Sequence, residues 1–460
     1  MSVDARKIIW KGLSGEAGME CSLHRPFRRA LFLLTICATV FLVGYPDVRI
    51  GLAAGLGSIG TRSDVRRAIA FDPGNPALYE QMGLIYQRSL DASPAESIPW
   101  FRKAVAIDPD SGLYWERLGM ACEFTGDQIC AARSFSHATS LDPMNPQVLW
   151  LAANDDLYGG SNTEAAVSFR RLLEMDPKYA DAVFAVSLRA YTNPAIVADT
   201  VFPAHSSASL KLSYVNFLVR RNDFTEAGRM WSEAISTHQT FDFSQADPYL
   251  EKLISSGRIA QAAAVWSEME RLAVLPARGG KGSSNLVFNP DFEGSPLNAG
   301  FGWRCPEASA VNVTFGDPSG RQGARCLRID FLAPENHGVE AAYQLIPVSA
   351  GQSYRLTAWV RSAGILSTSG PRLRLADPIH SNCAPVETAS VGGTSPWHEV
   401  SVNFSTCSQT DLVRLSIWCP RDDSTGGIGG HFWVDDVTLK PLTQSSTRSP
   451  NDWPPQTQDR

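Results

Sequence analysis

Three short stretches in the C-terminal part of the chain alternate between apolar and polar residues, at positions 354–361, 372–375 and 412–419. A period of two predicts β-strands that bury one face and expose the other. The polar positions of these strands include Trp359, Trp418, Arg355, Arg361, Arg374 and Arg414. A tryptophan is less expected than an arginine on a polar face, so the two indoles are candidates for a binding role.

The two indoles could bind a sugar, because the apolar face of a pyranose ring stacks on an aromatic ring while polar neighbours reach its hydroxyl groups. If the strands that carry Trp359 and Trp418 are neighbours, both rings lie on one surface rimmed by the four arginines. Arginines there could also bind acidic sugars through bidentate contacts. The alternative is that both tryptophans pack under a loop or against the helical part of the chain.

Four motifs in the same part of the chain resemble those of CenC-type carbohydrate-binding modules, in the family's order. They are Asn289-Pro-Asp-Phe-Glu293, the segment 349–361, Trp397, and Phe432-Trp-Val-Asp-Asp-Val-Thr-Leu439. The resemblance spans nearly the whole segment 285–442 and implies a jelly-roll sandwich of the galactose-binding-like kind, commonly with a structural calcium ion. Such sandwiches are also reused for protein contacts, so the resemblance alone does not establish sugar binding.

The resemblance also implies which acids would hold the calcium ion. By position these are Glu293 and Asp435, with Asp436 as the weaker choice. Calcium takes hard carboxylate and carbonyl oxygens, and ligands from the first and last strands would pin the two ends of the domain together. Without the resemblance, the same residues are simply acids at a turn and at a strand end.

Helical repeats precede the predicted sandwich. The dipeptide Asp-Pro recurs with its prolines spaced 36, 34 and 34 residues apart, at Pro73, Pro109, Pro143 and Pro177. The unit that ends at Pro143 contains Trp115, Leu118, Gly119, Gly126, Ala131, Phe135 and Ala138. These positions resemble the tetratricopeptide repeat motif, in which small residues let two helices cross closely and a proline ends the second helix. The groove of such repeats usually holds a peptide or a partner protein, so we expect a protein partner.

Composition and periodicity divide the chain into six segments. We expect a cytoplasmic basic tail at 1–29, a transmembrane anchor and joint at 30–59, and a repeat solenoid of about six helical hairpins at 62–275. A flexible linker rich in Gly and Ser at 276–284 leads to the β-sandwich at 285–442, and a disordered tail follows at 443–460. The predicted fold class is an all-α helical-repeat solenoid followed by an all-β jelly-roll sandwich, with one N-terminal transmembrane helix.

The anchor is predicted from an apolar run of 16 residues, Ala30–Tyr45, that follows Arg25, Arg28 and Arg29. The run is a little shorter than the ~20 residues that cross a bilayer, and the segment 50–59 could lengthen it. The basic flank predicts an N-terminal tail in the cytoplasm and a single pass through a bacterial inner membrane, with the bulk of the chain in the periplasm. A cleaved signal peptide, followed by secretion, is the alternative.

Charge and cysteine content argue against some functions. The net charge of −6 disfavours nucleic acid as a partner, because phosphate binding needs a basic surface. Seven of the nine cysteines lie beyond the anchor, where export favours disulfides. Cys122 and Cys130 are either bonded to each other or two buried thiols. The cysteines and histidines lack the spacing of a zinc site.

These observations predict a non-catalytic, membrane-anchored binding protein. The segment Gly55–Gly60 matches a dinucleotide-binding pattern, but no strand precedes it as that fold requires. The expected roles are glycan binding by the sandwich and partner-protein binding by the repeats, in export or assembly of a surface polysaccharide. The alternatives are a protein scaffold without a sugar ligand and, more remotely, a sugar hydrolase or lyase, which would need a facing pair of carboxyl groups.

Overall fold

The computed structural model describes residues 7–10, 19–22, 26–279, 284–306, 311–321, 324–332, 338–367, 369–421 and 429–442. The chain falls into two compact units, Met1–His205 and Ser206–Arg460. Among the described residues, the first unit is helical apart from one short hairpin, and the second joins four helices to a β-sandwich. The predicted disordered tail at 443–460 lies outside the described residues.

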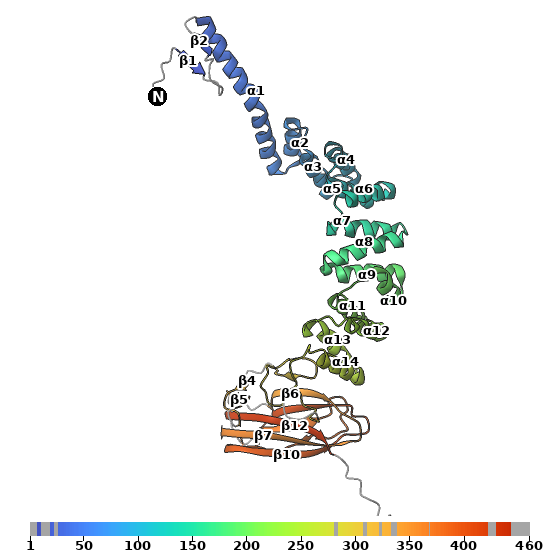
Figure 1. Cartoon of the computed structure of the whole chain (residues 1–460), viewed down its shortest axis with the longest axis vertical. Coiled ribbons are helices and arrows are strands. Elements are labelled where there is room, and N and C mark those ends of the chain that lie inside the picture. Colours follow the sequence, from blue (N-terminus) through green and yellow to red (C-terminus); the bar gives the residue numbers. More distant parts are fainter. Residues whose placement is uncertain are drawn as a thin grey trace, which may run out of the picture. The chain divides into compact units, whose positions relative to one another are not determined.

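The first unit consists of the antiparallel strands β1 (Lys7–Trp10) and β2 (Met19–Ser22) and a series of helices (Figure 1). The helices are α1 (Pro26–Ile59), α2 (Arg62–Phe71), α3 (Pro76–Arg88), α4 (Ile98–Ile107), α5 (Gly112–Phe124), α6 (Gln128–Leu141), α7 (Pro146–Tyr158), α8 (Asn162–Met175), α9 (Ala180–Tyr191) and α10 (Pro194–Val201). Short 3-10 turns at Pro94–Ser97 and Pro177–Tyr179 precede α4 and α9. Helices that follow one another pack as hairpins, α3 with α4, α5 with α6, and α7 with α8.

The residues of the repeat motif make the contacts that the motif predicts. Gly119 of α5 lies against Phe135 of α6, and a Cβ atom at Gly119 would be 2.6 Å from Cε1 of that ring. Gly83 of α3 and Phe101 of α4 make the same contact one hairpin earlier. The first two of these hairpins therefore close by placing a phenylalanine ring on a glycine, and the predicted helical repeats are confirmed.

Helix α1 is both the predicted anchor and part of the repeats. Among the described helices, it is the one long and apolar enough to cross a membrane, over Ala30–Ile59. Its C-terminal end packs into the repeats, where Ala53 contacts Ala68 of α2 and Leu78 of α3, and Gln81 Nε2 donates to the carbonyl oxygen of Gly57 at 2.8 Å. Residues 50–59 continue the helix of the apolar run, and of their small residues Ala53 and Gly57 are buried.

The second unit contains helices α11 (Ala208–Arg220), α12 (Phe224–Ser236), α13 (Phe243–Ser255) and α14 (Ile259–Arg271). Its strands are β3 (Trp303–Arg304), β4 (Val311–Asp317), β5 (Cys326–Phe331), β6 (Val339–Pro347), β7 (Ser353–Ile365), β8 (Arg372–Ala376), β9 (Val386–Glu387), β10 (Gly393–Ser405), β11 (Leu412–Cys419) and β12 (Gly430–Pro441). They form two antiparallel five-stranded sheets, in the orders β10-β7-β12-β5-β4 and β3-β6-β11-β8-β9. The predicted sandwich is confirmed.

The core of the sandwich contains the apolar positions that the alternation of the sequence predicts. Leu356 and Val360 of β7 are fully buried, and so are Leu415 and Ile417 of β11. Side chains next to them in sequence point to the other face of each strand. This alternation fixes the outward direction of the candidate side chains on these strands.

Hydrogen bonds join the first and last segments of the sandwich. The side-chain amide of Asn285 donates to the carbonyl oxygen of Val437 at 3.0 Å, and its Oδ1 accepts from the backbone N–H of Leu439 at 3.0 Å. The backbone N–H of Val437 donates to the carbonyl oxygen of Pro290 at 2.9 Å. The two ends of the domain are thus held together by backbone and amide groups.

The last repeat helices pack directly on the sandwich. The ring of Trp266 on α14 contacts Phe288 and Phe301 edge to face, at centroid distances of 5.2 and 5.6 Å. Beside them, the Arg278 guanidinium donates to the carbonyl oxygen of Asn285 at 2.7 Å. The described residues on both sides of the expected linker are therefore held by contacts, and the boundary at 276–284 stays a prediction.

Candidate functional site

The structure places Trp359 and Trp418 on opposite outer faces of the sandwich. Trp359 lies on β7, whereas Trp418 lies on β11, and these strands belong to different sheets. Both rings point away from the core because their neighbours Val360 and Ile417 are buried in it. The prediction of one surface carrying both rings is therefore wrong. Of the six predicted residues, Trp418, Arg374 and Arg414 lie on one face and Trp359, Arg355 and Arg361 on the other.

One outer face, which we call the Trp418 face, is formed by β6, β11, β8 and β9. Its residues are Trp418, Tyr343, Ser416, Arg372, Arg374, Arg414, Glu340 and Glu387. The guanidinium carbon of Arg414 lies 3.6 Å from the ring centroid of Tyr343, and that of Arg374 lies 5.3 Å from the ring of Trp418. The face therefore presents two aromatic rings, each with an arginine stacked beside it.

Carboxylates hold the arginines of the Trp418 face in place. Arg414 Nε donates to Glu340 Oε1 at 3.0 Å, and a second nitrogen of the same guanidinium pairs with Oε2, which makes the contact bidentate. Glu387 pairs with Arg372 at 3.1 Å and lies 3.9 Å from Arg374 Nε. About a third of the Arg414 and Arg374 side chains remains exposed, 35% and 33%. Arg414 is thus oriented by Glu340 and remains partly exposed to a ligand, whereas Arg374 Nε is buried without a hydrogen-bond partner among the described residues.

The opposite face, which we call the Trp359 face, carries a tryptophan that an arginine already covers. The guanidinium carbon of Arg321 lies 3.5 Å from the ring centroid of Trp359. Arg361 lies in the same way over Trp433, at 4.6 Å, and Arg355 is exposed further along β7. Because a cation–π contact contributes ~0.5–2 kcal/mol, a ligand would have to displace Arg321 before it could stack on Trp359.

The three predicted calcium ligands lie together beside Trp359. Glu293, Asp435 and Asp436 line one cavity of about 640 Å³. Its other lining residues are Asn285, Pro290, Asp291, Arg321, Ala324, Thr357, Trp359 and Thr438. A bulge between Asp435 and Thr438, where β12 slips relative to β7, brings both aspartates to the cavity.

Arginines and backbone N–H groups already bind these acids. The backbone N–H of Arg321 donates to Asp435 Oδ2 at 3.1 Å, and its guanidinium pairs with Asp436 Oδ2 at 2.8 Å. The backbone N–H of Arg325 donates to Glu293 Oε1 at 3.0 Å. In the described part of the chain, the carboxylate oxygens of the three acids do not all lie within 4.8 Å of one another. As they are placed, these residues do not fit a calcium ion.

Burial changes the charge state of one of these acids. Only 1% of Asp435 is exposed, and the loss of hydration raises the pKa of its carboxyl group to about 6. The N–H groups of Arg321 and Asp436 oppose this shift, while the negative charge of Asp436 adds to it. Asp435 is therefore partly protonated in mildly acidic solution.

Two disulfides occur among the described residues. Cys122 and Cys130 join α5 to α6, which settles the alternative left open for this pair. Asp127 lies beside these cysteines, and the three form the one described group with the arrangement of metal ligands. Because both sulfur atoms are bonded to each other, neither is a thiolate that could bind zinc.

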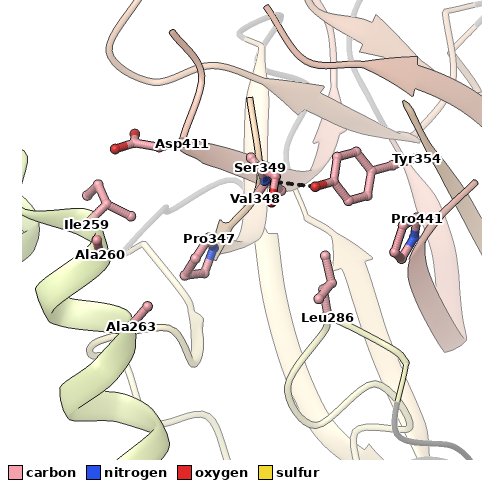
Figure 2. Close-up of a pocket in the computed structure, with 10 residues that line it drawn as sticks. All are labelled: Ile259, Ala260, Ala263, Leu286, Pro347, Val348, Ser349, Tyr354, Asp411 and Pro441. Atoms are coloured by element: carbon pink, nitrogen blue, oxygen red, sulfur yellow. Dashed lines mark hydrogen bonds between the residues drawn. The ribbon is translucent and has the colours of Figure 1, made fainter. Parts of the chain in front are cut away.

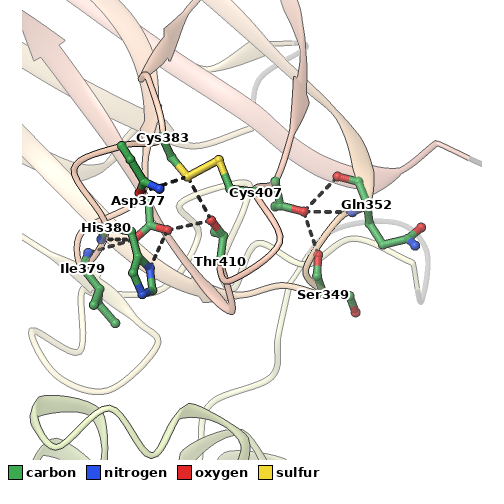
Figure 3. Close-up of a disulfide and its surroundings, with 10 residues drawn as sticks. Ser349, Gln352, Asp377, Ile379, His380, Cys383, Cys407 and Thr410 are labelled. Carbon is green, nitrogen blue, oxygen red and sulfur yellow. Dashed lines mark hydrogen bonds and ion pairs between the residues drawn. A yellow bond between two sulfur atoms is a disulfide. The ribbon is translucent and has the colours of Figure 1, made fainter.

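The second disulfide, Cys383–Cys407, joins the loops after β8 and β10 (Figure 3). Beside it, Asp377 Oδ2 accepts from the hydroxyl of Thr410 at 2.6 Å and contacts His380 Nδ1 at 3.1 Å. These bonds hold the pKa of Asp377 below its usual value although burial alone would raise it. The Thr410 hydroxyl and the His380 imidazole both bind the Asp377 carboxylate, so the histidine does not activate the threonine as a nucleophile. The cluster instead helps to hold the two loops together.

A second cavity, of about 370 Å³, lies between α14 and the sandwich. Figure 2 shows its lining residues, Ile259, Ala260, Ala263, Leu286, Pro347, Val348, Ser349, Tyr354, Asp411 and Pro441. The phenol oxygen of Tyr354 accepts a hydrogen bond from the backbone N–H of Ser349 at 2.8 Å. Asp411 is the one charged residue in this lining. The cavity is thus an apolar space at the packed junction, without paired acids.

Sequence reasoning missed Tyr343 and Glu340 on the Trp418 face and Arg321 on the Trp359 face. The register of β6 against β11 shifts between Ile417 and Trp418, so that both Ala341 and Ala342 are buried while Glu340 and Tyr343 face outward. Strict alternation does not reveal such a bulge. The available signal for the bulge was the pair Ala341 and Ala342, two small residues between Glu340 and Tyr343. Arg321 lies between strands, where no periodicity indicates a direction.

Comparisons with known proteins found similar solved structures for the two parts of the chain separately. No protein-family model matches the chain, and no curated protein matches it. For the helical part, the structure is similar to YrrB, described as "a TPR protein with an unusual peptide-binding site", at 16% identity over 43% of this chain and 90% of that one, with a TM-score of 0.28. It is also similar to MamA protein, at 14% identity over 46% and 94% of the two chains, with a TM-score of 0.28.

The neighbours of the β part are carbohydrate-binding modules. One is titled "CBM4 structure and function", at 16% identity over 34% of this chain and 99% of that one, with a TM-score of 0.25. Another is the Clostridium thermocellum xylanase 10B fragment CBM22-1–GH10 complexed with xylohexaose, at 18% identity over 35% and 29%, with a TM-score of 0.24. These likenesses concern the fold, which is a helical repeat followed by a β-sandwich. The CenC type stays a prediction.

Proposed function

We propose that this chain is a non-catalytic, membrane-tethered binding protein whose sandwich binds a saccharide on the Trp418 face and whose repeats bind a partner protein. The observation that carries the proposal is the outward position of Trp418 on β11, next to Tyr343 of the adjacent strand β6, whose ring Arg414 covers at 3.6 Å. A sugar ring can stack on such a surface, and hydroxyl groups around the ring need the donors and acceptors that Arg374, Arg414 and Glu340 supply.

The ion pairs of the Trp418 face favour binding over mere surface charge. A free arginine side chain loses rotamer entropy when it is immobilised by a ligand, at about 0.5–1.5 kcal/mol for each such side chain. On this face the carboxylates of Glu340 and Glu387 have already fixed the guanidinium groups. A saccharide would therefore meet oriented donors, and a negatively charged sugar would find arginines that can bind it in a bidentate manner.

The same carboxylates support a non-catalytic role. Glycoside hydrolysis uses two carboxyl groups about 5–10 Å apart on either side of the bond that is cleaved. Glu340 and Glu387 lie on β6 and β9, so three strand spacings of ~4.8 Å put their backbones about 14 Å apart, and their side chains lean toward each other to reach Arg414 on β11 and Arg372 on β8. Each is also bound to an arginine. The Trp418 face is therefore suited to holding a sugar and unsuited to cleaving one.

Helix α1 supports the tether. Its apolar side chains are exposed, Leu34 by 69% and Leu42 by 72%, and exposure of this kind along ~20 residues is favourable in a bilayer. The basic residues that precede it orient the chain with its repeats outside the cytoplasm. We place the protein in a bacterial inner membrane, facing the periplasm, where export or assembly of a surface polysaccharide would use a sugar-binding scaffold.

The test uses the full chain in detergent micelles on a glycan array, with the variants Trp418→Ala and Tyr343→Ala. Truncation of an aromatic anchor at a binding surface costs about 2 kcal/mol, or roughly 30-fold in affinity. Trp359→Ala is the matched control, because it removes the same ring from the opposite face. We expect the first two variants to lose binding and the control to keep it.

Two outcomes would contradict the proposal. If the folded wild-type chain binds no glycan, the sandwich is a docking domain and the protein is a scaffold without a sugar ligand. If Trp359→Ala weakens binding as much as Trp418→Ala does, the Trp418 face is not the binding site. Thermal melting of each variant shows that the sandwich remains folded.

A further inference from the structure

Three carboxyl groups gather at the C-terminal ends of two neighbouring repeat helices. Glu123 precedes the last residue of α5, and Asp155 and Asp156 lie in the last turn of α7. The two helices are in contact, and the negative charge of Asp155 acts on both Glu123 and Asp156. We call Glu123, Asp155 and Asp156 the acidic corner.

The position of the acidic corner is unfavourable in the free protein. The C-terminal end of a helix carries a partial negative charge, which repels carboxylates and stabilises cations. Neither α5 nor α7 has a basic residue in its last turn. The helix ends and the carboxylates therefore combine into a site of negative potential that the helices themselves do not neutralise.

Asp155 is the buried member of the acidic corner. The residue is 95% buried, since 5% of it is exposed, and its Oδ1 atom has no hydrogen-bond partner among the described residues. A buried polar atom without a partner destabilises the folded state, and more so when it is charged. The charged residues of the described chain that act on the three carboxyl groups are themselves acidic, namely Asp155 and Glu164.

The raised pKa values of the three carboxyl groups have the same cause, which is burial without a neutralising charge. Burial raises the pKa of Asp156 to about 6, with a further contribution from the charges of Asp155 and Glu164. Burial also raises the pKa of Glu123 and of Asp155, and Asp155 adds to the shift of Glu123. A positive charge placed among the three groups would lower all of these pKa values and relieve the repulsion.

Two exposed aromatic rings lie at the same helix ends. Phe124 and Tyr158 are the last residues of α5 and α7, and so occupy equivalent positions in consecutive repeats. They are 70% and 78% exposed. The apolar stem of a lysine or arginine side chain packs on such a ring, and its charge is attracted to the ring face.

We propose that the acidic corner, with Phe124 and Tyr158, binds a basic segment of a partner protein by taking a lysine or arginine side chain at the two helix ends. The half-buried Glu123 and Asp156 contact the cation, and the buried Asp155 contributes its charge. This inference rests on the proposed binding of a partner protein by the repeats, and it adds the chemistry of that partner.

The test measures binding of a fluorescein-labelled octa-arginine peptide to the full chain in detergent micelles, by fluorescence anisotropy. The double variant Glu123→Gln, Asp156→Asn removes two charges from the corner. The control double variant Glu174→Gln, Asp199→Asn removes the same charge from exposed positions on α8 and α10. We expect the corner variant to bind about tenfold more weakly, which corresponds to 1.4 kcal/mol, and the control to change by less than twofold.

Two further measurements, thermal stability and glycan binding, separate a loss of peptide binding at the acidic corner from other causes. Removal of mutually repelling charges leaves the corner variant at least as stable as the wild type, so its loss of binding is not loss of fold. Equal weakening in the control variant would overturn the inference, because the peptide would then be attracted by net charge alone. Tighter binding of an octa-glutamate peptide than of octa-arginine would overturn the inference that the partner segment is basic. The repeats would still be a binding surface. If neither peptide binds a chain that still binds glycan, the inference fails and the saccharide proposal survives.

Discussion

Arginine is the recurring partner of aromatic rings and acids on both faces of the sandwich. Arg321 stacks on Trp359 and binds Asp436, and Arg414 stacks on Tyr343 and binds Glu340. The guanidinium group stays protonated throughout the physiological pH range. The arginines in these contacts therefore keep their charge when neighbouring carboxyl groups titrate, and the buried acids with raised pKa values are one source of pH-dependent behaviour.

One such acid makes a testable contribution at the residue scale. The folded state holds the proton of Asp156 more tightly than the unfolded state, because the pKa of Asp156 is raised from 3.8 to about 6. Its stabilising contribution is thus complete below pH ~4 and is lost as the pH rises through about 6. We expect Asp156→Asn to be more stable than the wild type at pH 7.5, by about 1 kcal/mol after allowance for solvent screening.

Thermal unfolding of both chains between pH 7.5 and pH 4.5 measures this contribution. The difference between the variant and the wild type should shrink as the pH falls, since the protonated aspartic acid resembles asparagine in charge. A difference that stays constant over this range would contradict the assignment of the raised pKa to Asp156.

Single residues also show how far the sequence could predict the site. The outward direction of Trp359 and Trp418 followed from a period of two, which is a local property. Whether the two rings share a surface depends on which strands are hydrogen-bonded neighbours, and alternation carries no information about pairing. The acids Glu293 and Asp435 were found through motif positions, and the arginines that bind them were not, because Arg321 and Arg325 lie outside the motifs.

At the scale of secondary-structure elements, the helical hairpins depend on close crossings at glycine. A methyl group at Gly119 would lie 2.6 Å from the Phe135 ring, which the packed interior cannot absorb without movement. We expect Gly119→Ala to destabilise the repeats by about 1–3 kcal/mol, the usual cost of overpacking a core. Calorimetric melting of the full chain measures the effect.

Gly74→Ala is the matched control, because no atom lies within 4 Å of the Cβ that it would add. This substitution should leave the melting temperature unchanged or slightly raised, since alanine restricts the unfolded chain more than glycine does. Equal destabilisation by the two substitutions would show that loss of glycine flexibility, and not the contact with Phe135, decides the outcome.

The elements themselves were largely predictable, and the junction between them was not. Repeat spacing and small residues at fixed positions specified the helices, because each hairpin is stabilised mainly by its neighbours. Trp266 lies on α14, inside the segment 62–275 that was predicted as repeats. Its ring also contacts Phe288 and Phe301 of the sandwich, and no periodic signal reports a contact between two different kinds of domain.

At the scale of the whole molecule, the packing of α1 predicts that the anchor is retained. Ala53, which is 1% exposed, and Gly57 contact α2 and α3 through the C-terminal end of α1. Cleavage of the chain between Tyr45 and Ile59 would separate the apolar run from the C-terminal end of α1 and disturb its contacts with α2 and α3. We expect a chain with tags at both ends to keep both and to remain in the membrane fraction after an alkaline carbonate wash. Release of a shorter chain that lacks the N-terminal tag would contradict this prediction.

The continuity of α1 has a consequence for encounters in the membrane. One helix carries both the proposed membrane span and the side chains that pack on α2 and α3, so a continuous helix, with Pro46 inside it, would link the bilayer to the start of the repeats. Binding sites on the first repeats would then stay at a nearly constant distance from the membrane surface. Confinement to this thin layer raises their effective concentration toward partners in the same membrane. Reorientation of these sites would require a change in helix tilt, which depends on bilayer thickness.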